Sequence, residues 1–329
     1  MDAATPRIIV GRYTDPSGTS GLQRFRLSGD TLVPEASLDL PSPSWATWAG
    51  DRLVAVSELA QSRLSVVTVG DDGFEFVSSI PSEGADACHV AVSPDSAHIA
   101  VANYSSGSSL LVPNPADGDL ARVDPHLVVF QGSGPVADRQ EHAHAHQVTW
   151  LDATSFLVSD LGSDLIRRLS IGADGVPVED TPIGVPSGFG PRHLVLRGDD
   201  QLVVVGELSG QVLSLRRTGA EWTVADEVPA TATGRPAQPS GVLLHDGGLI
   251  VGNRQVDTVA RFSWSHDGSL SLDWEAPCGG DLPRDLQLGH GLLWVALQNS
   301  GEVVAHRLGG SGLTEVLRYP VEGAARVLV

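Results

Sequence analysis

The sequence of 329 residues contains no lysine, so all 21 basic residues are arginines. Chemistry that needs a primary amine, such as Schiff-base formation or phosphate binding by a P-loop lysine, is therefore excluded. Arginine stays charged and offers a planar fork to carboxylates and phosphates. Any anion site in this chain must be built from arginine, histidine and backbone amides.

Cysteine is nearly absent as well. Cys88 and Cys278 form no C-x-x-C motif and cannot make a disulfide framework, so we expect both to pack as small apolar side chains. No apolar run approaches the ~20 residues of a membrane-spanning helix. The N-terminal segment MDAATPRIIVG begins acidic and lacks the apolar core of a signal peptide. These absences predict a cytoplasmic protein.

Positive charge is scarce relative to negative charge. The 40 acidic residues outnumber the arginines, and the net charge of −19 is spread along the chain. A field of this sign repels phosphate backbones and anionic lipids, so we expect neither nucleic acid nor a membrane as a partner. An acidic, solvated surface accounts for the charge, and a monomer or a weak oligomer is expected.

One unit recurs along the chain: a short apolar strand, a polar turn and a second apolar strand. Asp and Gly residues in the turns mark each unit as a β-hairpin. The copies include SWATWAGDRLVAVSEL from Ser44, CHVAVSPDSAHIAVANY from Cys88, HQVTWLDATSFLVSDL from His146, RHLVLRGDDQLVVVGEL from Arg192, SGVLLHDGGLIVGNR from Ser240 and RDLQLGHGLLWVALQN from Arg284.

The spacing of the copies predicts the fold. A polar residue ends the second strand of each copy, at Arg12, Glu58, Asn103, Asp160, Glu207, Asn253 and Gln298. The steps between them are 46, 45, 57, 47, 46 and 45 residues, and the long step contains the insertion GSGPVADRQEHA. Seven units of about 47 residues match the period of four-stranded antiparallel propeller blades.

The first copy is cut short before Arg12, and the C-terminal segment GAARVLV can supply its innermost strand. Closing the ring with strands from both termini removes the exposed edges of the sheets. The sequence therefore predicts an all-β fold, a single seven-bladed β-propeller domain over residues 1–329.

The two strand ends at one side of each hairpin bring polar residues together. In a hairpin, the start of the first strand and the end of the second lie at the same end. Histidines and arginines concentrate at these ends, whereas the opposite ends carry ordinary turn residues. We therefore expect a functional site at one mouth of the central channel, formed by His89, His146, Arg192, Arg254, Arg284, Glu58, Glu207, Asp160 and Asn103.

At these residues the sequence resembles the lactonase propeller family, which includes bacterial 6-phosphogluconolactonase and fungal carboxy-muconate cyclase. The matching segments follow the family order from end to end: GRYTDPSGTSGL, PSPSW before VSE, ANYSSGS, DRQEHAHAHQV, SDLGSD, GFGPRHLVL, GEL, GNRQVDTVARF and LPRDLQL. Two positions depart from the family pattern. Arg12 replaces a small residue, and Gly206 stands where the family carries asparagine, which leaves the exact substrate open.

The resemblance implies roles for five residues. His146 is the family's proposed catalytic histidine, and either His146 or Glu207 could be the base that activates water. Arg192 would stabilise the oxyanion or an adjacent anionic group. Arg254 and Arg284 would hold a phosphate or carboxylate.

Four further residues are expected to bind substrate: His89, His144, Asn103 and Glu58. His142, His144 and His146 alternate, so on a strand they would share one face, as the ligands of a metal ion could. The first two fall in the insertion, however, and the resemblance implies no metal. We therefore expect neither a metal nor a cofactor.

The predicted function is hydrolysis of a small anionic sugar lactone, as in the carbohydrate metabolism of the pentose phosphate route. Two alternatives remain open. A cycloisomerase or lyase acting on a muconate-like organic acid would use the same arginines with a proton shuttle. A non-catalytic propeller would bind a ligand or partner at this face, since fold alone does not choose among these functions.

Overall fold

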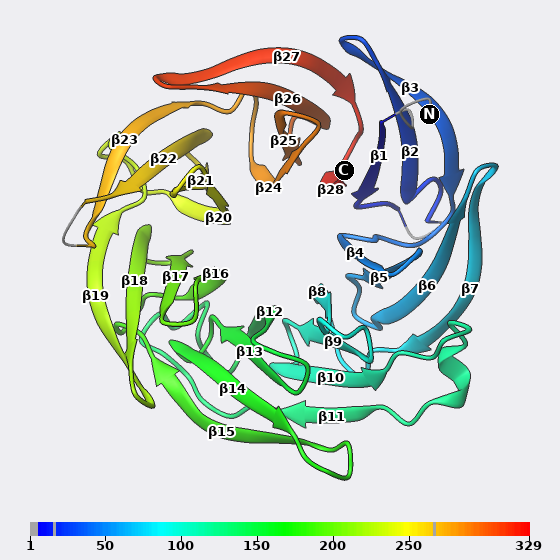
Figure 1. The fold of residues 1–329 in the computed structure, drawn as a ribbon, viewed down its shortest axis with the longest axis horizontal. Helices are drawn as coiled ribbons and strands as arrows, with labels where there is room; N and C mark the ends of the chain where they lie inside the picture. Colours follow the sequence, from blue (N-terminus) through cyan, green and yellow to red (C-terminus); the bar gives the residue numbers. More distant parts are fainter. Residues whose placement is uncertain (1–5, 16–17, 266–267) are drawn as a thin grey trace.

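The computed structural model describes residues 6–15, 18–265 and 268–329. Residues 1–5 of the N-terminal segment considered above, and residues 16–17 of GRYTDPSGTSGL, lie outside the described residues. The 28 described strands form seven four-stranded antiparallel sheets arranged as the blades of a ring (Figure 1). The predicted seven-bladed β-propeller is thus confirmed. That residues 1–329 act as a single domain stays a prediction.

The blades are numbered along the chain, and their strands are given from the centre of the ring outward. Blade 1 contains β28 (Ala324–Leu328), β1 (Arg7–Arg12), β2 (Leu22–Ser28) and β3 (Thr31–Leu38). Blade 2 contains β4 (Trp45–Ala49), β5 (Arg52–Ser57), β6 (Arg63–Gly70) and β7 (Gly73–Pro81). Blade 3 contains β8 (Ala87–Val92), β9 (His98–Asn103), β10 (Ser108–Pro113) and β11 (His126–Val129). Blade 4 contains β12 (Ala145–Trp150), β13 (Ser155–Asp160), β14 (Leu165–Ile171) and β15 (Pro177–Gly184).

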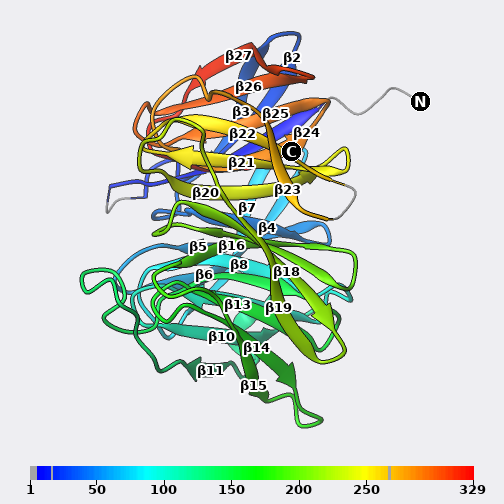
Figure 2. The ribbon, with the colours of Figure 1, turned by 90° about the vertical axis from the view of Figure 1, so that its left-hand side faces the viewer.

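The remaining three blades follow the same order. Blade 5 contains β16 (Pro191–Arg197), β17 (Gln201–Gly206), β18 (Gln211–Thr218) and β19 (Glu221–Pro229). Blade 6 contains β20 (Gln238–His245), β21 (Gly248–Arg254), β22 (Thr258–Trp264) and β23 (Leu270–Pro277). Blade 7 contains β24 (Pro283–Gly289), β25 (Leu292–Leu297), β26 (Glu302–Gly309) and β27 (Gly312–Pro320). Figure 2 shows the strands running across the thickness of the ring, so the hairpin ends lie on its two faces.

The ring is closed by the two ends of the chain, as predicted. The C-terminal strand β28 pairs antiparallel with β1, with Val10 opposite Val327 and Ile9 opposite Leu328. The blade is therefore continuous although its strands come from opposite ends of the sequence. Pairing both termini into one sheet leaves no open edge at the seam of the ring.

Apolar side chains fill the space between neighbouring blades. Seven buried clusters each combine residues of two adjacent blades, and one cluster lies at each blade interface. At the seam, Val10 and Phe25 of blade 1 pack with Trp294 and Val303 of blade 7. Burial of apolar area is worth about 25 cal/mol per Å². These interfaces therefore stabilise the ring without any disulfide, and both Cys88 and Cys278 are buried free thiols.

The insertion predicted from the long repeat step lies between β11 and β12, at residues 130–144. Blade 3 also holds the short 3-10 helix η1 (Leu120–Arg122). No helix in the described ranges is long and apolar enough to cross a membrane.

β-Bulges interrupt the innermost strands of six blades near their first residues. The pairing registers shift between Ala87 and His89, Ala145 and Gln147, Pro191 and His193, Pro239 and Val242, Pro283 and Asp285, and Ala324 and Arg326. A bulge leaves one residue outside the ladder and re-aims its side chain. The single residues released in this way are Cys88, His146, Arg192, Arg284 and Ala325.

Candidate active site

A cavity of about 340 Å³ lies between the inner strand ends of blades 2 to 7. Its lining residues are Glu58, Cys88, Tyr104, Arg139, His146, Glu207, Gln238, Arg254 and Arg284. Five of the nine residues predicted for the site therefore line this cavity: His146, Glu207, Arg254, Arg284 and Glu58. Three of the lining residues, Cys88, His146 and Arg284, are bulge residues.

A second set of residues, four of which line the cavity, follows the ends of the second strands. The residues paired with the start of each bulge are Arg12, Asn103, Asp160, Gly206, Asn253 and Leu297. The residue after each of these positions, with Glu58 after the end of β5, forms the equivalent set Tyr13, Glu58, Tyr104, Leu161, Glu207, Arg254 and Gln298. The strand-end residues predicted from the sequence came partly from the paired position, as with Arg12 and Asn103, and partly from the position after it, as with Glu58 and Glu207. Because side chains alternate along a strand, an error of one residue points a side chain elsewhere.

Glu207 binds three guanidinium groups. Arg139 Nη2 donates to Oε1 at 2.5 Å, and Arg254 Nη2 donates to Oε2 at 2.5 Å. Arg192 Nε lies 2.9 Å from Oε2, although not in hydrogen-bond geometry, while its Nη1 donates to the Ser240 carbonyl. Arg192 does not line the cavity but lies behind Glu207, with 1% of its surface exposed.

This arrangement determines the charge state of the carboxylate. Burial by itself would raise the pKa of Glu207, but the cations of Arg254 and Arg192 outweigh it and hold the pKa well below its ordinary value. Burial, together with repulsion from Arg254 and Arg284, lowers the pKa of Arg192 to about 9. Glu207 is therefore an anion and a weak proton acceptor, and Arg192 is a cation at neutral pH.

On the other side of the cavity, Tyr13 links Glu58 to Arg284. The Tyr13 hydroxyl donates to Glu58 Oε2 at 2.7 Å and accepts from Arg284 Nη2 at 2.6 Å. Burial raises the pKa of Tyr13, which therefore remains a neutral phenol. Four arginines and two glutamates surround the cavity, an excess of two positive charges in a protein of net charge −19.

His146 is an uncharged member of the site. Burial and the cation of Arg192 lower its pKa well below 6.5, so the imidazole is uncharged at neutral pH. Its Nδ1 is buried without a hydrogen-bond partner. The ring lies edge-on to Tyr104 and to His193, with centroid distances of 5.7 and 5.2 Å. A neutral imidazole has one unprotonated ring nitrogen, so His146 can accept a proton, although burial and the neighbouring cations lower its basicity.

The other predicted site residues lie around the cavity without lining it. His89 packs against Trp45 with a centroid distance of 4.4 Å, and its Nδ1 accepts from the Val148 amide. His144 stacks on Tyr104 with a centroid distance of 4.5 Å. Asn103 is fully buried, and its amide donates to the Ser82 carbonyl and the Ser108 hydroxyl. Their roles in substrate binding remain predictions.

Sequence reasoning missed four polar residues of the site: Tyr13, Tyr104, Arg139 and Gln238. Tyr13 and Tyr104 occupy the same repeat position as Glu58 and Glu207, so a shift of one residue in the alignment of the copies would have found them. Arg139 comes from the insertion, where no repeat position exists. Its Nη2 donates to the Tyr104 hydroxyl at 3.2 Å as well as to Glu207.

The buried histidines predict a steep loss of stability on acidification. Burial lowers the pKa values of His89, His146 and His193 well below 6.5. As the pH falls below about 6.5, the unfolded chain binds protons that the folded protein does not. Each of these histidines then removes about 1.4 kcal/mol of stability per pH unit, until its own folded pKa is reached.

Denaturant unfolding between pH 7 and 5.5 measures this slope, above the range in which most carboxylates titrate. The variant His89→Asn keeps an acceptor for the Val148 amide. Its unfolding free energy should fall less steeply with decreasing pH, by about the 1.4 kcal/mol per pH unit that one histidine contributes. An equal slope in both proteins would contradict this assignment.

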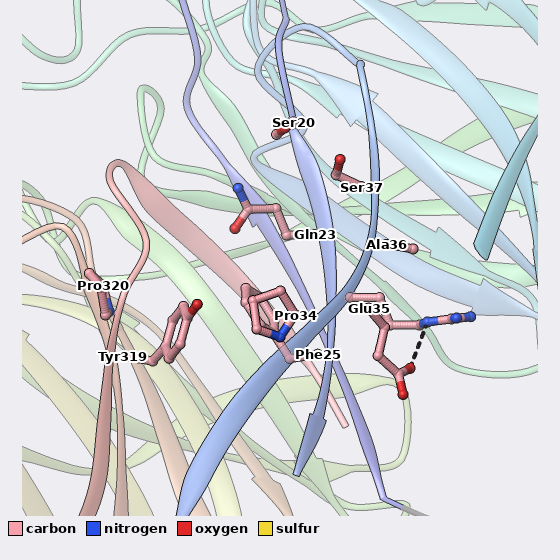
Figure 3. Close-up of a pocket in the computed structure, with 10 residues that line it drawn as sticks. Ser20, Gln23, Phe25, Pro34, Glu35, Ala36, Ser37, Tyr319 and Pro320 are labelled. Atoms are coloured by element: carbon pink, nitrogen blue, oxygen red, sulfur yellow. Dashed lines mark ion pairs between the residues drawn. The ribbon is translucent and has the colours of Figure 1, made fainter. Parts of the chain in front are cut away.

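A larger depression, of about 460 Å³, lies at the outer edge of the ring between blades 1 and 7. Figure 3 shows Tyr319 and Pro320 of β27 on one side and residues of β2 and β3 on the other. Its charged side chains, Arg24 and Glu35, form an ion pair with each other at 3.2 Å. The outer depression therefore contains only one pair of charged side chains, whereas five charged side chains line the central cavity.

Comparison with known proteins agrees with the fold and adds the family. The probable 6-phosphogluconolactonase of Arthroderma benhamiae is 32% identical over 206 residues, which cover 60% of this chain and 51% of that protein. The chain thus matches about half the length of this curated relative.

Two solved structures superpose on nearly the whole chain. A candidate 6-phosphogluconolactonase from Bacteroides fragilis is 25% identical, with a TM-score of 0.88 over 98% of this chain and 97% of that one. The periplasmic gluconolactonase of Pseudomonas aeruginosa is 23% identical, with a TM-score of 0.88 over 98% of each chain, and shows the shared fold alone. A family model described as a lactonase with a seven-bladed β-propeller matches residues 7–328. The chain belongs to the lactonase seven-bladed β-propeller family.

Proposed function

We propose that this chain hydrolyses a small anionic sugar lactone in the central cavity, as a lactonase of the 6-phosphogluconolactonase type. The observation that carries the proposal is the excess of positive charge around the cavity of an acidic protein. Guanidinium groups bind phosphates and carboxylates through paired hydrogen bonds. The names of the relatives support the same substrate class.

Arg284 and Arg254 hold the anionic group of the substrate in this proposal, with Arg139 at the more exposed edge of the cavity. Arg192 acts through Glu207, which it contacts from behind. Glu207 in turn positions Arg139 and Arg254. The oxyanion that develops on the lactone carbonyl lies in the positive field of these arginines, where charge is stabilised without reorganisation of solvent.

His146 is the proposed base. Its neutral imidazole takes a proton from water as the water oxygen attacks the carbonyl carbon. The ring C–O bond of the lactone then breaks, and the leaving alkoxide takes a proton from the imidazolium. Glu207 is the weaker candidate for this role because both of its carboxylate oxygens already accept hydrogen bonds, from Arg139 and Arg254.

A panel of substrates tests the proposal. We expect the purified protein to hydrolyse 6-phosphogluconolactone with a higher kcat/KM than unphosphorylated gluconolactone, because only the former carries a phosphate for the arginines. Conversion of a carboxy-muconate without lactone hydrolysis would favour a cycloisomerase. If none of these compounds is converted, the lactonase proposal is contradicted and a non-catalytic, ligand-binding propeller is favoured.

Arg139→Gln tests the contribution of the insertion to binding. A hydrogen bond to a charged group is worth about 1.5–3 kcal/mol, so KM for the phosphorylated lactone should rise roughly tenfold or more. The KM for the neutral lactone should change little. Arg122→Gln, a surface arginine paired with Asp117 and Asp119, serves as the matched control. Equal effects on both lactones would contradict a role in anion binding.

We also propose that the protein is cytoplasmic and acts in the pentose phosphate route. We further propose that it is a monomer or a weak oligomer and that it binds neither nucleic acid nor a membrane.

A further inference from the structure

Three metal-ligating side chains meet at the end of the insertion, outside the central cavity. His144 Nε2 lies 3.2 Å from Glu141 Oε1, and His142 Nε2 lies 3.4 Å from the same oxygen. The three potential ligand atoms lie within 4.8 Å of one another. Sequence alternation instead grouped His142 and His144 with His146, which the bulge in β12 turns into the cavity.

The hydrogen bonds of the two rings determine which nitrogen is free. His142 Nδ1 lies 2.8 Å from the Ala143 carbonyl, and His144 Nδ1 lies 3.1 Å from the Tyr104 carbonyl. A carbonyl only accepts, so each Nδ1 carries the proton. Both Nε2 atoms then face the Glu141 carboxylate, which can only accept. The contact therefore requires a positive group between them, either a second proton on a ring or a metal ion.

A bound metal ion supplies that positive group at a pH where the rings are unprotonated at Nε2. Metal-ligating histidines commonly donate their second ring nitrogen to a carbonyl or carboxylate, which orients the ring and sets the tautomer. Zinc takes histidine nitrogen and carboxylate oxygen at about 2.0–2.2 Å in tetrahedral geometry, which separates its ligand atoms by about 3.4 Å. The two distances to Glu141 Oε1 match this separation.

The backbone that carries the cluster is held from two sides. A Cβ at Gly162 would lie 1.9 Å from the His142 carbonyl, and a Cβ at Gly107 would lie 2.2 Å from the Ala143 carbonyl. The His144 amide donates to Asp160 Oδ1 at 2.8 Å. The histidine backbone is thus packed closely against neighbouring strand ends, as a preorganised site requires.

We propose that Glu141, His142 and His144 bind a divalent transition metal ion of the zinc type, with a fourth position open to water. Two imidazole nitrogens and one carboxylate suit such an ion better than calcium or magnesium, which prefer oxygen ligands. The ion would secure the segment two residues beyond Arg139, and Tyr104 separates it from the cavity. This proposal differs from the expectation, drawn from the sequence, that the chain binds no metal.

Titration of the chelator-treated full-length protein with ZnCl₂ at pH 8, followed by calorimetry, tests the site without substrate. We expect one zinc ion per chain and a higher midpoint of thermal unfolding in its presence, because the ligand binds the folded state. In His142→Ala and in Glu141→Gln, zinc affinity should fall at least tenfold, and the rise in the midpoint should shrink accordingly.

His290→Asn is the matched control, since it removes an exposed histidine at a positive-φ position that asparagine tolerates. Its zinc affinity should equal that of the unaltered protein. Circular dichroism of each variant without metal checks that the propeller is folded. The proposal is overturned if the unaltered protein binds no stoichiometric zinc, or if both cluster variants bind it as tightly as the control.

Discussion

Replacing His146 with alanine should lower kcat for lactone hydrolysis by about 10²-fold or more while the protein remains folded. The imidazole is neutral and lines the cavity, and a neutral imidazole has one unprotonated nitrogen, so His146 is the group that we propose to accept a proton from water. Loss of a base slows the chemical step, and KM should therefore change less than kcat. Steady-state kinetics with the phosphorylated lactone measure both constants.

A buried histidine outside the cavity provides the control for this experiment. His306 is buried, and its Nε2 lies 3.0 Å from the Cys278 carbonyl. Glutamine can donate to the same carbonyl, so His306→Gln should keep kcat near that of the unaltered protein. An unchanged kcat in folded His146→Ala would remove His146 from the mechanism and return Glu207 to consideration as the base.

Glu207→Gln should destabilise the protein by about 3–5 kcal/mol, the usual cost of removing one partner from a buried ion pair. Glutamine keeps the size of the side chain but leaves Arg139, Arg192 and Arg254 without their shared counter-ion. Denaturant unfolding measures the loss. Inorganic phosphate should stabilise this variant more than the unaltered protein, because an anion can replace the missing charge.

The dependence on pH separates this effect from a general packing defect. The pKa of Glu207 is depressed in the folded state, so its contribution to stability is present above pH ~4.3 and is lost as the pH falls toward the folded pKa. The difference between the two proteins should therefore be largest near neutral pH and shrink in acid. Glu302→Gln, which breaks an exposed pair with Arg318, should cost at most about 1 kcal/mol. Equal losses in the two variants would contradict the network around Glu207.

These two predictions assign different tasks to the two residues between which the sequence could not choose. Both were candidates for the base because both end up at the same mouth of the channel. In the proposed mechanism Glu207 acts as a positioning residue, because three guanidinium groups surround its oxygens. Burial and the cation of Arg192 keep His146 neutral, so one of its nitrogens has a free lone pair.

The propeller itself could be predicted because its evidence is periodic. Hairpin patterns recur at steps of 45–47 residues, apart from one step of 57 that contains the insertion, and each copy carries the apolar alternation that a blade must bury. The closure of the ring could also be predicted from the sequence, because the first copy lacked its innermost strand and the C-terminal segment GAARVLV could supply it. The structure pairs β28 with β1 accordingly.

The composition of the cavity depended on details that periodicity does not carry. Six β-bulges interrupt the innermost strands and release residues such as His146 and Arg284 from the ladder, and nothing in a hairpin pattern reveals a single extra residue. The strand-end set was displaced by one position at Arg12 and Asn103. Their neighbours Tyr13 and Tyr104 are the residues that reach the site.

The sequence by itself determined the seven-bladed ring, its closure and the face on which arginine and histidine gather, because repeats and residue types are local properties. Only the tertiary structure decided how the charges pair. Glu207 collects Arg139, Arg192 and Arg254 from three separate segments. It also separated His146 from His142 and His144 and placed the latter two on Glu141. Such contacts depend on how blades and the insertion approach one another in space, to within a single residue of strand register.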